Sequence, residues 1–206
     1  MYIPKYFKVT NSQEIQQFIQ YNSFATLVSM RNNRPMAVHL PLQLVEKEDG
    51  HYLTGHVAYG NPIWRSLQGL EQVLVMFQGP HAYISSSWYE KENVPTWNYQ
   101  AVHIYGQATT FSGEALEKDL AALLVKYEGH RERPVLWETL SPELLERELK
   151  GIVGIQIKIE EIQAAYKMSQ NRTADDYAEI TNKLEQERDA GAHAVAKEMK
   201  RNSPHS

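Results

Sequence analysis

Residues 79–106 read GPHAYISSSWYEKENVPTWNYQAVHIYG, and the rest of the chain is organised around them. The stretch holds two of the four tryptophans, a run of three serines, two prolines and two histidines. Large flat rings beside hydroxyls and an amide suit a pocket that holds a planar ligand and anchors its polar edges. The alternative is a strand, a loop and a second strand that are merely rich in aromatic residues.

The chain has 206 residues, a length that indicates one large globular domain, or one domain with an appendage. It contains no cysteine, which excludes a disulfide scaffold, a thiolate metal site and a cysteine nucleophile. The chain does not begin like a signal peptide, and no apolar stretch approaches the ~20 residues that span a bilayer. We therefore expect a cytoplasmic protein that makes no membrane contact.

The charge gives little support to nucleic-acid binding. The formal net charge is −4 at pH 7 and the isoelectric point is about 6.1, whereas binding to DNA phosphates calls for an excess of positive charge. The basic clusters at residues 131–133 and 197–201 are short and contain acids, as solvated helix faces do. No helix-turn-helix pattern stands out, so direct DNA contact is only weakly supported.

Short periodic segments predict several strands and a few single helices. We expect strands over residues 24–30, 35–45, 51–57, 73–78, 81–88, 101–111 and 152–159. Helices are expected over residues 10–21, 61–67, 112–127 and 141–151, and from a cap at Thr173 onward. Gly79 and Pro80 predict a bend, Ser112 and Ser141 are the expected caps of two helices, and Gly191 is a point where the last helix can break.

Six or seven strands joined mostly by short turns predict a mainly β, α+β protein, an antiparallel barrel with peripheral helices and a C-terminal helix. The βαβ alternation of a doubly wound sheet is absent, and so are a glycine-rich phosphate loop and a GxGxxG motif.

Four histidines fall on predicted strands, His39, His56, His81 and His103. They lack close HxH spacing and no carboxylate lies among them, so buried or pocket histidines are favoured over metal ligands. Ser85 and the two serines after it lack a nucleophile-elbow context, which argues against a serine hydrolase.

The junction at Asn61 and Pro62 carries a separate signal. Asn61 is a suitable helix cap and Pro62 a suitable first helical residue. A helix that starts there directs free backbone N–H groups toward the end of the preceding strand, and such groups attract phosphate.

Several motifs along almost the whole chain resemble the PaiB family of FMN-binding split-barrel proteins, which are described as negative transcriptional regulators. The shared motifs are MYIP at 1–4, HLPL at 39–42, GHVA at 55–58 with NP at 61–62, FQGPHAYIS at 77–85 with WY at 88–89, PTWNY at 95–99 with VH at 102–103, IVG at 152–154 and KMSQNR at 167–172. The chain departs from the family pattern at Tyr59, where an arginine is usual, and at Ser86, where a proline is usual. The change at Tyr59 removes a cation from beside the predicted helix start.

The resemblance implies an FMN-binding split β-barrel over residues 1–168 with inserted helices, followed by a polar C-terminal helical extension over residues 169–206. It also implies a homodimer with the flavin held between subunits. The cofactor-binding candidates are His39, His56, Asn61, Arg65, Tyr83, Ser85, Trp88, Tyr89, Trp97, Asn98, Lys167, Gln170 and Arg172, of which Arg65 is added because it lies one turn into the helix that starts at Asn61.

Roles for these residues follow from their chemistry. Arg65, Lys167 and Arg172 supply positive charge for a phosphate, together with the helix start at Asn61. The rings of Trp88, Tyr89 and Trp97 suit stacking on an isoalloxazine, and Ser85, Asn98 and Gln170 suit its polar edge. Packing at a dimer interface is the alternative for Trp88 and Trp97, a surface position for Arg65, and simple capping of the last helix for residues 167–172.

Three functions remain open at this point. The resemblance implies a flavin-binding negative regulator of protease production and sporulation genes, acting on DNA directly or indirectly. The alternative is a flavin-dependent oxidoreductase. No pair of residues is identified as its acid and base, although His81 or Tyr83, in the stretch expected near the flavin ring, has suitable chemistry. The third is a barrel that binds haem or another small molecule.

Overall fold

The structure is a computed structural model that describes residues 1–67, 69 and 72–204. Its strands are β1 (Lys8–Val9), β2 (Phe24–Arg31), β3 (Arg34–Pro41), β4 (Gln43–Lys47), β5 (Gly50–Ala58), β6 (Val73–Ile84), β7 (Thr96–Phe111) and β8 (Ile152–Lys167). Its α-helices are α1 (Ser12–Tyr21), α2 (Ile63–Ser66), α3 (Glu114–Glu128), α4 (Pro142–Leu149), α5 (Ala174–Gln186) and α6 (Ala190–Arg201). Three single turns of 3-10 helix are η1 (Lys5–Phe7), η2 (Ser86–Trp88) and η3 (Trp137–Thr139).

The strands form one eight-stranded sheet in the order β3-β2-β6-β7-β8-β5-β4, with β1 added beside β8. The β2–β3, β2–β6, β4–β5, β5–β8 and β1–β8 pairs are all antiparallel. The predicted mainly β architecture with peripheral helices is therefore confirmed. In the part of the chain that the structure describes, no helix has the length and apolar character to cross a membrane.

The chain divides into two compact units. Unit 1 comprises Met1–Phe18, Phe77–His103 and Gln163–Ser206, and unit 2 comprises Ile19–Met76 and Ile104–Ile162. The long strands β6, β7 and β8 each contribute residues to both units.

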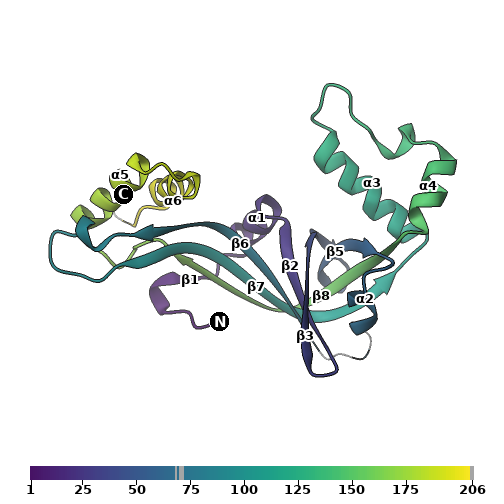
Figure 1. Cartoon of the computed structure of the whole chain (residues 1–206), viewed down its shortest axis with the longest axis horizontal. Coiled ribbons are helices and arrows are strands. Elements are labelled where there is room, and N and C mark those ends of the chain that lie inside the picture. Colours follow the sequence, from purple (N-terminus) through teal and green to yellow (C-terminus); the bar gives the residue numbers. More distant parts are fainter. Residues whose placement is uncertain (68, 70–71, 205–206) are drawn as a thin grey trace. The chain divides into compact units, whose positions relative to one another are not determined.

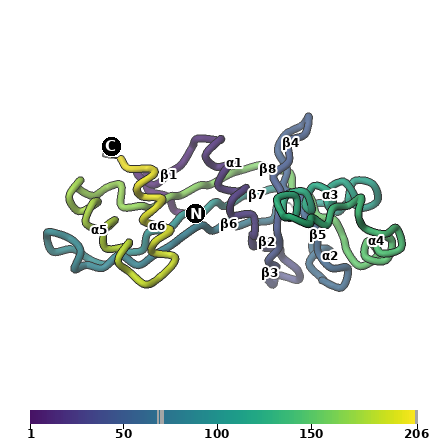
Figure 2. The backbone as a smooth tube through the Cα atoms, turned by 90° about the horizontal axis from the view of Figure 1, so that it is seen from above, coloured from purple at the N-terminus to yellow at the C-terminus, as the bar shows by residue number. Residues whose placement is uncertain are grey.

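Unit 1 is built on the β6–β7 hairpin, the end of β8 and the two C-terminal helices. Figure 1 shows α5 and α6 alongside the turn end of that hairpin, and the tube in Figure 2 shows the same neighbours from above. Ile180 and Leu184 of α5 and Val195 and Met199 of α6 are fully buried. Burial of such side chains stabilises a fold by about 1.5–3 kcal/mol each.

Unit 2 contains the two short hairpins and the helices α2, α3 and α4. Asn32 and Asn33 both have positive φ, which the β2–β3 turn needs and asparagine tolerates. Alternate residues along the strands point inward and are fully buried; they include Leu27, Leu53, Val75, Ile104, Ile155 and Ile157. Gly106 has no room for a side chain, because a Cβ there would lie 2.0 Å from the Lys158 carbonyl oxygen.

Several predicted boundaries were wrong, each for a local reason. The strand expected over residues 35–45 is divided at Leu42, whose N–H donates to the Ser23 carbonyl oxygen at 2.9 Å. The bend expected at Gly79 is absent, because β6 continues through it and Gly79 serves close packing: a Cβ there would lie 2.7 Å from the Phe18 ring. Strand β8 runs eight residues beyond the expected end at Ile159, to Lys167.

The helix termini also differ in part from the expectation. Helix α3 begins after Gly113, at a φ of 63°, and not at a Ser112 cap. Ser141 and Thr173 do cap α4 and α5 as predicted. The single last helix is two helices, and they separate before Gly191: the Asp189 side chain caps α6 by accepting from the Ala192 N–H at 3.0 Å.

Candidate functional site

The thirteen predicted cofactor residues are divided between the two units. His39, His56, Asn61 and Arg65 belong to unit 2. Nine belong to unit 1: Tyr83, Ser85, Trp88, Tyr89, Trp97, Asn98, Lys167, Gln170 and Arg172. Each set is described by itself.

Lys167 and Arg172 form a pair of cations at the end of β8. Ser169, with a φ of 61°, turns the chain between them, and the Arg172 N–H donates to the Ser169 carbonyl oxygen at 3.0 Å. The Lys167 ammonium donates to the Thr96 hydroxyl. Burial, and then the nearby Arg172 guanidinium, lower the pKa of Lys167. Among residues 1–67, 69 and 72–204, neither cation forms an ion pair, so the pair has the charge to receive an anion.

The Arg172 guanidinium lies over an aromatic ring as well, 4.8 Å from the centroid of Tyr89. Tyr89 is buried, and its hydroxyl has no hydrogen-bond partner among the described residues. A buried hydroxyl without a partner is costly in free energy unless a water or a ligand satisfies it. Arg172 and Tyr89, which are far apart in the sequence, therefore belong to one cluster.

Trp97 is the centre of an exposed aromatic group. Its side chain is 54% exposed, and the rings of Tyr83 and His81 lie 5.9 and 6.2 Å from it, centroid to centroid. Trp88 is half-buried in η2, and Ser85 caps the start of that turn: its hydroxyl accepts from the Ser87 N–H at 3.3 Å. A tryptophan that remains so exposed provides apolar surface for a flat ligand or for another protein.

Asn98 and Gln170 are already engaged inside the protein. Asn98 is fully buried and exchanges hydrogen bonds with the Ser169 hydroxyl, at 3.0 and 3.1 Å. The Gln170 amide accepts from the Met168 N–H at 2.7 Å and donates to the Tyr166 carbonyl oxygen at 2.5 Å. These bonds fix the turn that carries Lys167 and Arg172.

In unit 2 the predicted phosphate position is a single turn of helix. The Asn61 side chain accepts from the Ile63 N–H at 3.0 Å, and α2 has four residues. Arg65 is exposed, and its guanidinium lies 4.1 Å from the Trp64 ring and 5.4 Å from the Tyr59 ring. Tyr59, which occupies the position where the family usually has arginine, thus holds the neighbouring cation by its ring.

The two histidines of unit 2 have different surroundings. His39 is exposed; its ring stacks 6.2 Å from Phe24 and bonds the Thr26 hydroxyl at 2.9 Å. His56 is half-buried, and burial lowers its pKa, while the Asp119 carboxylate opposes the shift. Among the described residues no group of three His, Cys, Asp or Glu side chains is arranged to hold a metal ion.

Asp119 of α3 is a residue that the sequence interpretation missed. One carboxylate oxygen accepts from the Thr54 hydroxyl at 2.5 Å, and the other has no partner in the part of the chain that the structure describes. Burial raises the pKa of this carboxyl. The sequence did contain a sign of this residue, because Asp119 is an acid on the otherwise apolar helix face formed by Leu116, Leu120 and Leu123.

The comparisons with known proteins identify the family. Residues 1–161 match the family model described as "Putative FMN-binding domain". Over 199 residues the chain is 59% identical to the "Protease synthase and sporulation protein PAI 2" of Bacillus subtilis (strain 168), an alignment that covers 97% of this chain and 96% of that one. The chain belongs to the PaiB family of FMN-binding proteins. The resemblance seen in its motifs is confirmed.

Solved structures show the same fold for this PaiB-family chain at much lower identity. An FAD and heme binding protein from Mycobacterium smegmatis has a TM-score of 0.61 at 16% identity, over 83% of this chain and 78% of that one. The flavocytochrome Anf3 from Azotobacter vinelandii has a TM-score of 0.62 at 15% identity, over 86% and 78%. Identities this low speak for the fold alone, which is of the split-barrel type.

The residues of unit 1 fit FMN, the cofactor of the PaiB family. The unpaired cations Lys167 and Arg172 match a dianionic phosphate. The unsatisfied hydroxyl of Tyr89 and the exposed ring of Trp97 offer a polar contact and an apolar surface. When bound, FMN supplies redox chemistry, and the protein contributes binding, orientation and charge.

Proposed function

We propose that this protein binds FMN and acts in the cytoplasm as a negative regulator of the transcription of protease and sporulation genes. The observation that carries the proposal is the 59% identity, over nearly the whole of both chains, to the Bacillus subtilis protein named for protease synthesis and sporulation. The proposal extends to a homodimer in which each subunit contributes aromatic side chains to the flavin site.

The proposed phosphate contacts are Lys167 and Arg172. Both are partly buried cations without an acidic partner among the described residues, and a bound phosphate would relieve their mutual repulsion. Trp88, Tyr89 and Trp97 are the proposed neighbours of the flavin ring, with Tyr83 and Ser85 at its edge. The four predicted cofactor residues of unit 2, His39, His56, Asn61 and Arg65, stay predictions that FMN titration of their variants tests.

Titration of the purified protein with FMN, followed by flavin fluorescence and absorption, tests this assignment. We expect Lys167→Gln and Arg172→Gln each to weaken FMN binding by about tenfold, because each removes a charge-assisted hydrogen bond. Lys197→Gln, at an exposed position of α6, is the matched control. Unchanged affinity in both variants, with a loss in Arg65→Gln, would move the phosphate to the Asn61 junction.

Haem or another small molecule is the competing ligand, and the same titrations distinguish it from FMN. Phosphate contacts of the proposed kind favour FMN over riboflavin. A Soret band on addition of haem, together with no response to FMN, would support instead a barrel that binds haem or another small molecule.

The proposed regulation acts indirectly on DNA. The formal charge of −4 disfavours a direct contact with phosphates. We expect no shift of target promoter fragments in gels at low salt, while deletion of the gene raises expression of protease reporters. A shift that weakens steeply with salt would establish direct binding.

A flavin-dependent oxidoreductase is the second candidate, and the exposed group of His81, Tyr83 and Trp97 is the observation that favours it. A titratable ring beside an aromatic platform is suited to proton transfer near a flavin. Stopped-flow reduction of the FMN complex by NADH or NADPH distinguishes the two functions, because a regulator needs no rapid hydride transfer.

A further inference from the structure

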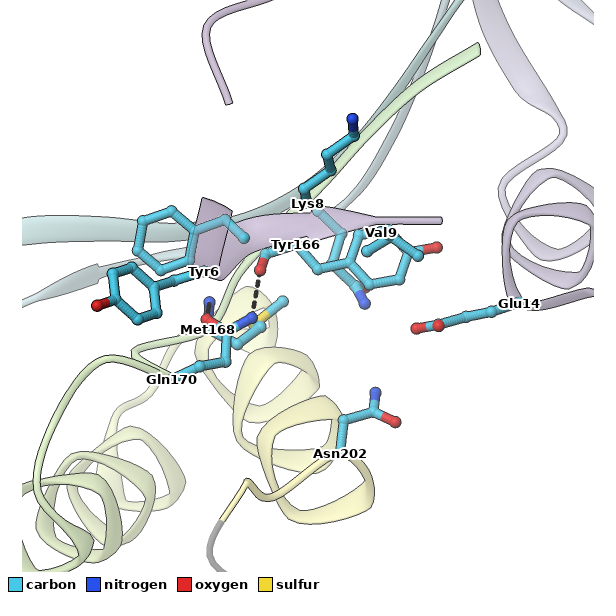
Figure 3. A pocket seen from close by; sticks show the side chains of 10 residues that line it. Tyr6, Lys8, Val9, Glu14, Tyr166, Met168, Gln170 and Asn202 are labelled. Carbon is cyan, nitrogen blue, oxygen red and sulfur yellow. Dashed lines mark hydrogen bonds between the residues drawn. The ribbon is translucent and has the colours of Figure 1, made fainter. Parts of the chain in front are cut away.

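Unit 1 contains a pocket that involves none of the cations or exposed rings assigned to FMN. It has a volume of about 90 Å³ and lies among η1, β1, the start of α1, β7, the end of β8 and the end of α6. Its lining residues are Tyr6, Phe7, Lys8, Val9, Glu14, Gln100, Tyr166, Met168, Gln170 and Asn202. All of them belong to unit 1, and eight are labelled in Figure 3.

Tyr166 provides an unsatisfied polar group in this pocket. Its side chain is only 5% exposed, and its hydroxyl has no hydrogen-bond partner among the described residues. Its ring is fixed by Phe18, 5.2 Å away. A hydroxyl buried in this way needs a water or a ligand.

Glu14 provides an unpaired carboxylate. It is half-buried, and within residues 1–67, 69 and 72–204 its carboxylate forms no hydrogen bond or ion pair. Burial raises its pKa, with Arg201 opposing the shift and Glu198 adding to it. Figure 3 shows Glu14 reaching from α1 toward the other lining residues, whereas the exposed Lys8 ammonium points away from it.

The charges around the Tyr166 hydroxyl are negative on balance. Burial has the largest effect on the pKa of Tyr166 and raises it, and the negative charges of Glu14 and Glu198 raise it further. The positive charge of Arg201 lowers this pKa, with the smallest effect of the four. A cation is therefore favoured at this point over an anion. Tyr6 and Phe7 supply aromatic rings, which also attract cations.

The volume limits the size of the occupant. A cavity of about 150 Å³ holds benzene, which has six non-hydrogen atoms. By proportion, the pocket of about 90 Å³ suits a ligand group of about four non-hydrogen atoms. The Gln170 amide is already bonded to Met168 and Tyr166, whereas the Tyr166 hydroxyl has no partner among the described residues and the Glu14 carboxylate is the acceptor that carries charge. Tyr6 is 72% exposed, so this wall is open to solvent.

We propose that this pocket binds the ammonium group of a short alkylamine, with the Glu14 carboxylate and the Tyr166 hydroxyl as acceptors and the rings of Tyr6 and Phe7 beside the cation. The pocket shares Gln170 with the predicted cofactor residues but none of the FMN contacts proposed above, and the proposal does not depend on them. It gives the protein a second ligand, a small organic cation.

The test is an NMR titration of the FMN-saturated protein with n-propylammonium chloride, 1-propanol and sodium acetate, which are of equal size and differ in charge. We expect n-propylammonium to shift the amide signals of Gln100 and Tyr166 with a dissociation constant on the order of 1 mM, near what so small a ligand can reach. We expect 1-propanol to bind at least about tenfold more weakly, and acetate to cause no shift.

Two variants and two matched controls locate the binding. Glu14→Gln should weaken n-propylammonium binding by about tenfold and Tyr166→Phe by about fivefold. Glu143→Gln and Tyr21→Phe, at exposed positions, should leave it unchanged. Tyr166→Phe keeps the ring that contacts Phe18, so this variant is expected to fold, which circular dichroism checks for all four.

Three results would overturn the proposal. Equal binding of n-propylammonium and 1-propanol would show that the pocket does not recognise a positive charge, and no loss in Glu14→Gln would show that this carboxylate is not an acceptor. Displacement of n-propylammonium by FMN in the FMN-free protein would assign the pocket to the flavin site.

Discussion

The two units of this protein share three long strands but bury different chemistry. Unit 2 has a largely aliphatic interior of fully buried Leu, Val and Ile side chains. Unit 1 buries a hydrogen-bonded amide, Asn98, and two tyrosine hydroxyls without partners in the described structure, those of Tyr89 and Tyr166. An apolar interior needs only shape, whereas buried polar groups need partners. Of the three buried side-chain atoms that lack a partner in the described structure, two lie in unit 1 and one, a carboxylate oxygen of Asp119, lies in unit 2.

The largest expected effect comes from removing α5 and α6 by ending the chain after Met168. Four fully buried apolar side chains are lost, Ile180, Leu184, Val195 and Met199. They represent about 6–12 kcal/mol, against a typical stability of about 5–15 kcal/mol. We expect an insoluble or unfolded product, measured by solubility and circular dichroism. A fragment that unfolds cooperatively at the parent's denaturant midpoint would instead establish the predicted division of the chain at residue 168.

The next largest effect concerns the buried amide of unit 1. Asn98→Ala leaves the buried Ser169 hydroxyl without its partner and should cost about 2–3 kcal/mol in urea denaturation. The double variant Asn98→Ala/Ser169→Ala should cost less than the sum of the two single changes, because each single change removes the same two hydrogen bonds. The Asn98 amide also donates to the Met199 sulfur at 3.5 Å, a contact that only the Asn98 change removes. Strict additivity would contradict the coupling.

A smaller effect follows from the pKa of His56 in unit 2. Burial lowers this pKa below its ordinary value of 6.5, so the unfolded state binds the proton more readily. The free energy of unfolding should therefore fall as the pH falls from about 7 through 6.5, and His56→Gln should reduce this slope. Asp119, whose pKa is raised from 3.8, acts in the opposite sense, since its contribution is lost as the pH rises above 3.8.

Urea midpoints measured between pH 5 and pH 7.5 check the His56 prediction. His130→Gln, at an exposed loop position, is the matched control. A slope that His56→Gln leaves unchanged would assign the pH dependence to other groups, of which His103 in unit 1 is the first to examine because burial lowers its pKa as well.

The smallest effect is expected at the surface of unit 2. Arg65 is exposed and contacts only rings among the described residues, so Arg65→Ala should lower stability by about 0.5–1 kcal/mol. Thermal unfolding measures this change, and FMN titration of the same variant shows whether the guanidinium also contacts phosphate. A larger loss of stability than that of Asn98→Ala would reverse the comparison of the two units.

Much of this protein could be predicted from its sequence by itself. Alternation of apolar residues determined most of the strands, and caps at Ser141 and Thr173 determined two helix starts, because these are local preferences of the backbone. Its long motifs determined the family and, with it, FMN as the cofactor.

Only the tertiary structure decided that Gly79 packs on Phe18 instead of forming a bend, and that the buried Asn98 amide is hydrogen-bonded to Ser169. It also decided that Glu14, Tyr166 and Asn202 meet at one pocket. Contacts of this kind join residues up to nearly 190 positions apart, and no local pattern in a single chain records which distant side chain fills the space beside another.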